Sequence, residues 1–588
     1  MKNFLKYTFA TVIGSFLTML IVLFVIFGIV ASISSSNDTV VNVKQNSILK
    51  VRLGNLVDRE PLNPLADFNF GDSDENDING LNLIIAAIES AKGDANIKGL
   101  YLDAMSFNSG GLAGLEALRN ALVDFHSSGK FIYSYSEYYT QRAYYLASVA
   151  DQIFVNPAGA VEIKGIGAQL LFFKNALNKL GVEMQIIRGP NNKFKSAVEP
   201  FMYDKMSEAN REQMMVFMNS IWGNMVKQMT TSRNISVEDF NQIADSLWAS
   251  SPEKAKSLKI VDQLAYYDEV VQALMDKVEV TKEKDLNILS LADYSSTVKP
   301  KNITSKTKIA VIYAVGEIQS GEGNDEIIGS ERIAKAISEA RKDSTIKAIV
   351  LRVNSPGGSA LASEVMWREL VLAKKDKPLI VSMGDYAASG GYYIACMADK
   401  IVAQPNTLTG SIGVFGMIPN IKSLLNDKIG ITTDEVSTNA NSITGVFSPL
   451  TSFQNKTIQM EVVRIYNTFV NHVAEGRNMK FEDVDAIGQG RVWSGANAID
   501  IGLVDELGGL DRAIEIAAEM SGAEEYKILE LPKRTNPLEE MFKQFGANAK
   551  VSVIESELGD NFKYYNYLKT IQNMDEIQAR LPFFFELN

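Results

Sequence analysis

The sequence predicts an α/β protein in which two copies of one domain follow an N-terminal transmembrane helix. Short strands of apolar and β-branched residues alternate with amphipathic helical segments, which is typical of α/β layers with mostly parallel strands. The pattern of the first half recurs in the second half, and an uncharged segment at residues 7–36 precedes both. At about 150 residues per domain, a chain of this length holds more than one core.

Composition excludes several classes of protein. Hydrophobic residues make up 46% and charged residues 22%, which fits neither a disordered chain nor a multi-span transporter. The net charge of −12 argues against a nucleic-acid partner, because phosphate binding needs a basic face. The single cysteine, Cys396, excludes an internal disulfide framework, and we interpret it as a buried packing residue. Only His126 and His472 are available for a zinc site or a Ser-His-Asp mechanism.

Residues 12–33 are apolar almost throughout and are long enough to cross a bilayer, which takes about 20 helical residues. Lys2 and Lys6 precede this segment, so the positive-inside rule keeps the N-terminus cytoplasmic and exports everything after about residue 37. We therefore assign residues 1–37 to the cytoplasmic N-terminus and a membrane anchor. The alternative is a cleaved signal peptide with Ala31 near the cut, although the apolar run exceeds the usual signal-peptide core. In both cases the bulk of the chain is exported.

Internal similarity indicates that a whole domain is duplicated. The matching pairs of segments are residues 97–102 with 346–351, the glycine pairs 110–111 with 357–358, and residues 144–151 with 392–399. The separation along the chain between the matching segments is far longer than the repeat of a solenoid protein. The second copy shows the expected alternation, with strands at 309–313 and 348–353 on either side of an amphipathic helix at 331–342.

The similarity also suggests the division of the chain. We expect an N-terminal repeat at 38–290, a linker with Pro300 at 291–308, and a C-terminal repeat at 309–532. The tail at 533–588 has no counterpart in the first half, and the sequence assigns it no role.

Two glycine-rich turns in the second repeat follow predicted strands. Paired glycines at 357–358 let a backbone turn sharply and bring N–H groups close to a ligand. Ser389, in the turn at 387–391, stands between a strand and a helix among small neighbours, which is typical of a nucleophile elbow. The alternatives are an ordinary strand-to-helix turn for the glycines and a helix N-cap for Ser389.

A lysine can activate such a serine where burial lowers its pKa and leaves a neutral amine, and Ser–Lys pairs are an accepted variant of the triad. Lys195 is the candidate base, although its segment alone could be a solvated loop. Gln141 stands opposite Ser389 in the first copy, and Thr444 stands opposite Lys195 in the second. Each copy has thus kept one member of the pair. Neutral drift could produce this, but a composite site shared by the two copies explains both absences.

At these residues the chain resembles signal peptide peptidase A in its long, tandem-repeat form, a Ser–Lys peptidase family. The resemblance covers all but the tail. The motifs that carry it are KSAVEPF at 195–201, NSPGGS at 354–359, AASGGY at 387–392, TGSIG at 409–413 and GRVW at 490–493.

The resemblance implies a Clp-protease/crotonase-like fold in each half and a membrane-anchored serine endopeptidase. Ser389 would be the nucleophile and Lys195 the general base, while the Ser411 hydroxyl would orient the lysine amine. The N–H groups of Gly358 and Gly390 would form the oxyanion hole. No metal, nucleotide or other cofactor is implied.

The resemblance further implies a place in the cell and a set of partners. The expected location is the bacterial inner membrane, crossed once, with the catalytic domain on the periplasmic side. The expected partners are apolar peptides such as cleaved signal peptides, and other copies of the chain in a tetramer. Lys193 is the competing lysine, because only the motif favours Lys195. A crotonase-type acyl-CoA enzyme and a catalytically dead oligomeric scaffold are the alternative functions.

Overall fold

The computed structural model describes residues 42–52, 54–59, 78–105, 107, 110–298, 304–534 and 577–581, together with residues 6–7, 11, 13–19 and 21. The predicted anchor at 12–33 lies largely outside these residues. Among the helices of the described ranges, none is both long and apolar enough to cross a membrane.

The first half is built around a parallel sheet with the strand order β8-β6-β5-β4-β1-β9. Alternating side chains of its strands enter two cores, as expected for a sheet covered by helices on both faces. Helices α2 and α3 pack on one face and α10 on the other. The bounds are β1 Ser47–Arg52, β4 Ile97–Asp103, β5 Phe131–Tyr139, β6 Gln152–Val161, β8 Gln263–Leu264, β9 Ile288–Ser290, α2 Leu81–Gly93, α3 Leu112–His126 and α10 Tyr267–Lys277.

The second half repeats this plan. Its sheet has the order β19-β17-β15-β13-β10-β21, with β16 beside β15 and β20 beside β16, and its strands are parallel except for the β17–β19 pair. Helices α12 and α13 pack on one face, and α18 packs on the other. The bounds are β10 Lys308–Val315, β13 Ile346–Ser355, β15 Leu379–Ala388, β16 Lys400–Ala403, β17 Leu408–Gly410, β19 Val492–Ser494, β20 Glu506–Leu507, β21 Lys527–Leu531, α12 Ser330–Lys342, α13 Ala360–Asp376 and α18 Leu510–Ser521.

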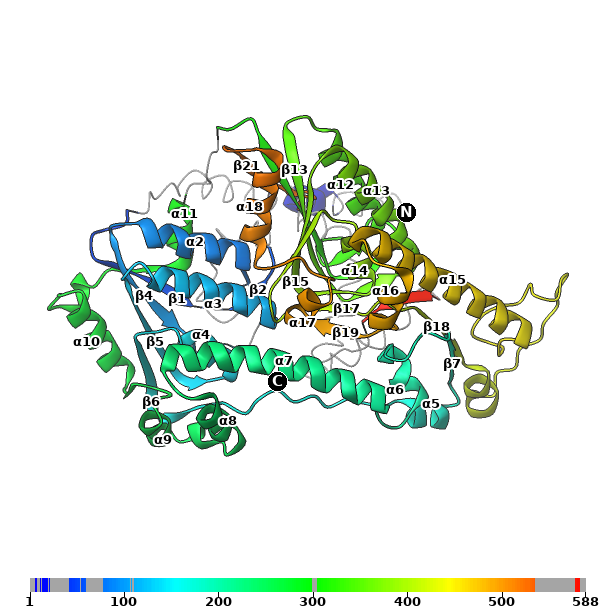
Figure 1. The fold of residues 1–588 in the computed structure, drawn as a ribbon, viewed down its shortest axis with the longest axis horizontal. Coiled ribbons are helices and arrows are strands. Elements are labelled where there is room, and N and C mark those ends of the chain that lie inside the picture. Colours follow the sequence, from blue (N-terminus) through cyan, green and yellow to red (C-terminus); the bar gives the residue numbers. More distant parts are fainter. Residues whose placement is uncertain are drawn as a thin grey trace.

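The predicted α/β duplication is confirmed, because the two halves share one sheet plan and corresponding helices (Figure 1). The short helix α4 (Gln141–Ala147) corresponds to α14 (Gly390–Ala395), and the long helix α7 (Glu208–Arg233) corresponds to α15 (Ser452–Arg477). Both long helices end at a left-handed asparagine, a residue that tolerates this conformation. Further helices are α5 Lys174–Leu180, α6 Glu199–Met202, α8 Val237–Asp245, α9 Pro252–Ser257, α16 Phe481–Ile487 and α17 Gly495–Asp500. Strands β2 (Asn55–Val57) and β3 (Ile78–Gly80) form a separate pair.

A third sheet combines segments from both halves and the tail. Its order is β12-β11-β14-β22-β18-β7, and β7 of the first half runs antiparallel to β18 of the second. The tail supplies β22, which the sequence did not predict. The bounds are β7 Glu183–Arg188, β11 Glu317–Gln319, β12 Ile327–Gly329, β14 Gly357–Ser359, β18 Phe415–Asn420 and β22 Ile577–Arg580.

The predicted linker does not begin as an irregular segment. Helix α11 (Leu291–Thr297) occupies its start, and Leu291 and Tyr294 are buried in the core of the first half. The burial of Leu291 and Tyr294 ties α11 to the core of the first half. The boundaries of the two repeats stay a prediction.

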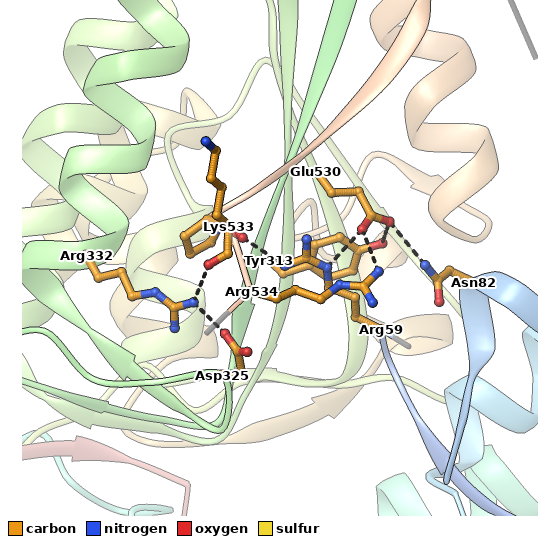
Figure 2. Close-up of polar contacts among 9 residues, drawn as sticks. Arg59, Asn82, Tyr313, Asp325, Arg332, Glu530, Lys533 and Arg534 are labelled. Carbon is orange, nitrogen blue, oxygen red and sulfur yellow. Dashed lines mark hydrogen bonds and ion pairs between the residues drawn. The ribbon is translucent and has the colours of Figure 1, made fainter. Parts of the chain in front are cut away.

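Polar contacts join the two halves beside the edge strand β21 (Figure 2). The Glu530 carboxylate accepts hydrogen bonds from Arg59 Nε at 2.9 Å and Asn82 Nδ2 at 3.1 Å, both from the first half. A second contact pairs the buried Arg352 with Asp58 at 2.6 Å. These contacts cross from one domain to the other and orient the halves that supply the site described next.

Candidate active site

Ser389 lies between the end of β15 and the start of α14, as the sequence predicted. Its φ of 55° and ψ of −114° are a backbone conformation that residues other than glycine rarely adopt. The Ser389 N–H donates to the Gly410 carbonyl at 2.8 Å, which fixes the turn. The hydroxyl makes no capping hydrogen bond to α14, so the N-cap interpretation is wrong. The side chain is fully buried and its hydroxyl is available for other partners.

Lys195 reaches this serine from the first half of the chain. Its Nζ lies 2.7 Å from Ser389 Oγ, 2.9 Å from Ser411 Oγ and 3.1 Å from the Ser411 carbonyl oxygen. Its side chain is 0% exposed. Lys193, the competing lysine, is exposed and lies over the Phe194 ring instead. The structure therefore brings Lys195, Ser389 and Ser411 together in one chain.

Burial shifts the protonation equilibrium of Lys195 towards the neutral amine. It holds the pKa of Lys195 well below the ordinary lysine value, because a buried ammonium loses its hydration. In the described part of the chain, no carboxylate pairs with this amine to offset that loss. A neutral amine has two N–H donors and one lone pair, and these match its three contacts. When the two N–H groups of a neutral amine donate to the two Ser411 oxygens, the lone pair is left to accept from the Ser389 hydroxyl, whose other acceptor is the Gly413 carbonyl at 3.4 Å.

The backbone of Ser411, like that of Ser389, is fixed by a hydrogen bond. It follows β17 directly, has a φ of 50°, and its N–H donates to the Arg491 carbonyl at 2.7 Å. The same segment carries Gly490, where an added methyl group would lie 2.4 Å from Lys195 Cβ. Only glycine leaves room for the lysine at this point, which explains why the GRVW motif belongs to the site.

Two residues that sequence reasoning missed position the lysine segment. Gln213 on α7 donates to the Phe194 carbonyl at 2.9 Å, and its carbonyl oxygen accepts from the Val492 N–H at 3.2 Å. Asn192 donates to the Val414 carbonyl at 2.8 Å. Both side chains are buried. An amide inside a helix or a loop carries no distinctive sequence signal, so only the assembled fold identifies them.

The two glycine turns contact each other next to Ser389. Gly357 and Gly358 have φ angles of 100° and 154°, in the range that favours glycine. A methyl group on Gly357 would lie 2.8 Å from the Gly390 nitrogen. The structure thus brings Gly357, the neighbour of Gly358, against Gly390, and the role of the Gly358 and Gly390 N–H groups in binding an oxyanion stays a prediction.

In each repeat, the residue at the position equivalent to the catalytic candidate of the other repeat has a different structural role. Gln141, opposite Ser389, accepts from the Lys164 and Gly165 N–H groups at 2.9 Å each. Its side chain therefore braces a loop in the place where the second copy has Ser389. Thr444, opposite Lys195, is exposed. The complementary losses seen in the sequence thus correspond to different local structures.

Each histidine lies beside a carboxylate. His126 Nε2 lies 2.9 Å from Asp151 Oδ1, and His472 Nε2 lies 3.0 Å from Glu364 Oε2. These carboxylates come from distant segments, so spacing could not reveal them. Within the described residues neither histidine hydrogen-bonds to Ser389. Cys396 is buried, as predicted, and burial raises the pKa of its thiol.

Comparison with known proteins finds a matching family and several similar proteins. The sequence profile of peptidase family S49 matches residues 111–281 and 372–524. Protease 4 of Haemophilus influenzae is 38% identical over 447 residues, covering 74% of this chain and 72% of that protein. Protease 4 of Salmonella typhi is 39% identical over 465 residues, covering 78% and 74%. Among solved structures, ClpP1 from Listeria monocytogenes is 18% identical, with a TM-score of 0.23 over 34% of this chain and 91% of that chain.

Proposed function

Because this chain belongs to peptidase family S49 and is a serine peptidase, we propose that Ser389 is its nucleophile and Lys195 its general base. The observation that carries the proposal is the contact of 2.7 Å between Lys195 Nζ and Ser389 Oγ, with both side chains fully buried. Burial supplies the neutral amine, and the amine in turn supplies the lone pair that a serine hydroxyl needs to become nucleophilic.

The proposed mechanism follows from these positions. Ser389 Oγ attacks the scissile carbonyl carbon while Lys195 Nζ takes the hydroxyl proton. The resulting ammonium keeps both Ser411 oxygens as acceptors and then gives a proton to the leaving amine. Water attacks the acyl-enzyme carbonyl while Lys195 takes one of its protons, and the ammonium returns that proton to Ser389 Oγ as the ester bond breaks and the acid product leaves. The N–H groups of Gly358 and Gly390 stabilise the negative charge on the carbonyl oxygen in both steps.

We further propose that the substrates are apolar peptides, including cleaved signal peptides. Two considerations support this. A site that keeps a lysine neutral by burial is poor in charge, so an acidic substrate would lose its hydration without gaining a partner. The motifs resemble those of signal peptide peptidase A, whose substrates have apolar cores. The alternatives of a dead scaffold and of an acyl-CoA enzyme both conflict with family membership joined to a complete Ser–Lys pair.

The cellular setting is part of the same proposal. The apolar segment at 12–33 would anchor the chain once in the bacterial inner membrane and leave the catalytic domain on the periplasmic side. The chain would assemble with copies of itself, as a tetramer by family resemblance. Protease treatment of spheroplasts tests the side of the membrane. The proposal expects degradation of the catalytic domain without lysis, and protection until lysis would contradict it.

The substrate proposal is tested with two quenched fluorescent peptides of equal length. One carries a Leu-Ala-Val core and the other has two of these residues replaced by aspartate. We expect the apolar peptide to be cleaved with a kcat/KM at least about tenfold higher, since burying an unpaired charge costs more than 1.4 kcal/mol. Ser389→Ala is the control for contaminating proteases. Equal cleavage of both peptides would contradict the proposal.

A further inference from the structure

The tail strand β22 lies in the middle of the third sheet, between β14 and β18 (Figure 1, red). It runs antiparallel to both neighbours. On one side Ala579 pairs with Gly358, and on the other Gln578 pairs with Phe415. In the described part of this sheet, β22 is the element that joins the β12-β11-β14 strands to the β18-β7 strands.

The carbonyl group of Ala579 lies against the glycine turns of the candidate active site. A methyl group on Gly357 would lie 2.3 Å from the Ala579 carbonyl oxygen, and one on Gly390 would lie 3.1 Å from it. Gly390 directly follows the proposed nucleophile Ser389. The tail therefore presents a backbone carbonyl oxygen to the turns from which the oxyanion hole is expected to form.

The spacing of the sheet indicates what this position can hold. Neighbouring strands lie about 4.8 Å apart, so β14 and β18 on either side of β22 leave room for one extended chain. An extended peptide that enters such a gap gains backbone hydrogen bonds on both edges, whatever its side chains. This is the requirement for a protease that cleaves varied peptides.

We propose that the gap between β14 and β18 is the peptide-binding groove, and that residues 577–581 occupy it as an intramolecular competitor of substrate. The inference rests on the proposed function, because it takes Ser389 as the nucleophile. The ligand class is an extended peptide of about five residues. The tail is thereby assigned a role that the sequence did not suggest.

Three contacts hold the tail in the groove. Arg580 Nη1 forms an ion pair with Glu317 Oε1 at 2.9 Å, and only 6% and 17% of these side chains are exposed. The Leu581 N–H donates to the Pro356 carbonyl at 2.7 Å. The Leu581 side chain is buried in the hydrophobic core that includes Ala388. These contacts are made by the two residues that follow Ala579, and they hold it at the glycine turns.

Competition between the tail and a peptide substrate can be measured through the apparent KM. If the tail fills the groove for about 90% of the time, the apparent KM for a peptide rises about tenfold while kcat stays unchanged. Removal of residues 577–588 should therefore lower the KM for the apolar peptide about tenfold. The matched control removes only residues 582–588 and should keep the KM of the full chain. An unchanged KM after the longer deletion would overturn the inference.

A second set of variants avoids deleting a central strand. Arg580→Glu places a carboxylate next to Glu317 and should lower the KM as the deletion does. Glu317→Arg in the same chain restores an ion pair and should raise the KM again. A synthetic peptide of residues 576–588 should inhibit the shortened protein competitively. Rescue by the second charge would identify tail release as the cause, and no effect of either charge change would contradict it.

Hydrogen exchange separates failure of this inference from failure of the proposed function. In the Ser389→Ala full chain, amides 577–581 should exchange slowly, and excess apolar peptide should make them exchange faster. Slow exchange that peptide accelerates supports the groove even if the wild-type chain cleaves no peptide, in which case the proposed function is wrong. Fast exchange without peptide, in a protein whose wild type cleaves peptides, contradicts the tail inference alone.

Discussion

Lys195 Nζ lies 2.7 Å from Ser389 Oγ, although 194 residues separate them in the chain. One residue comes from the first repeat and the other from the second, and both are fully buried at the contact. Neither repeat contains the other partner at its equivalent position, because Gln141 and Thr444 stand there. The pair therefore exists only when the two halves are docked.

Removal of either partner should abolish peptide hydrolysis. Ser389→Ala and Lys195→Ala should each lower kcat/KM by at least roughly 10²–10⁴-fold, the usual contribution of a positioned acid–base group. Because nucleophile and base act as a unit, the double variant should be hardly worse than either single one. Lys193→Ala is the matched control, since Lys193 is exposed and points elsewhere. Near-normal activity in Lys195→Ala together with loss in Lys193→Ala would show that the base is misassigned.

Activity should rise with pH through the lowered pKa of Lys195. Only the neutral amine accepts the Ser389 proton, so the rate increases as the ammonium loses its proton, well below the ordinary value of about 10.4. Ser411→Ala should lower kcat with little change in KM, because the amine loses an orienting acceptor. It should also move the rising limb to lower pH, since that acceptor favours the ammonium form.

The pH profile also has an outcome that contradicts this account. A limb near pH 6–7 that disappears in His472→Ala would identify a histidine as the base. The measurement is kcat/KM for the apolar peptide from pH 5 to pH 10, with circular dichroism at each pH to show that the fold persists.

The same buried lysine should make stability depend on pH. The pKa of Lys195 is lowered in the folded state, so between that pKa and about 10.4 the unfolded chain binds one more proton. The free energy of unfolding therefore increases with pH across this window, by at most about 1.4 kcal/mol per pH unit. Lys195→Met lacks this contribution.

Urea denaturation of the wild type and Lys195→Met at pH 7, 8 and 9 tests this expectation. The difference between their unfolding free energies should change in favour of the wild type as pH rises, because all other titrating groups are shared. A difference that stays constant, or changes in the opposite direction, would show that Lys195 is charged in the folded protein over this range.

The sequence was informative where function depends on local motifs. Ser389 and Ser411 follow the ends of neighbouring parallel strands, β15 and β17, so their proximity follows from the fold class. Lys195 could be paired with Ser389 because the two repeats could be aligned and each lacked one partner. Strand–helix alternation was likewise visible, since buried strands and amphipathic helices differ in their periods.

The sequence was uninformative where distant segments pair. Strand β7 joins β18 across the two halves, and the four-residue β22 joins a sheet far from its place in the chain. Such short strands have too few residues to show a period. The predicted linker includes helix α11, because serine, threonine and Pro300 are typical of linkers, whereas its burial depends on contacts of Leu291 and Tyr294 with a core built from distant segments.

Labelling of the active site tests the central claim, that Lys195 activates Ser389, most directly. The purified protein is treated with a serine-reactive phosphonate at several pH values, and the modified residue is mapped by mass spectrometry. The account predicts a label on Ser389, a labelling rate that rises with pH in the wild type, and a rate lower by roughly 10²–10⁴-fold in Lys195→Met. A label on another serine, or an unchanged rate in Lys195→Met, would contradict it.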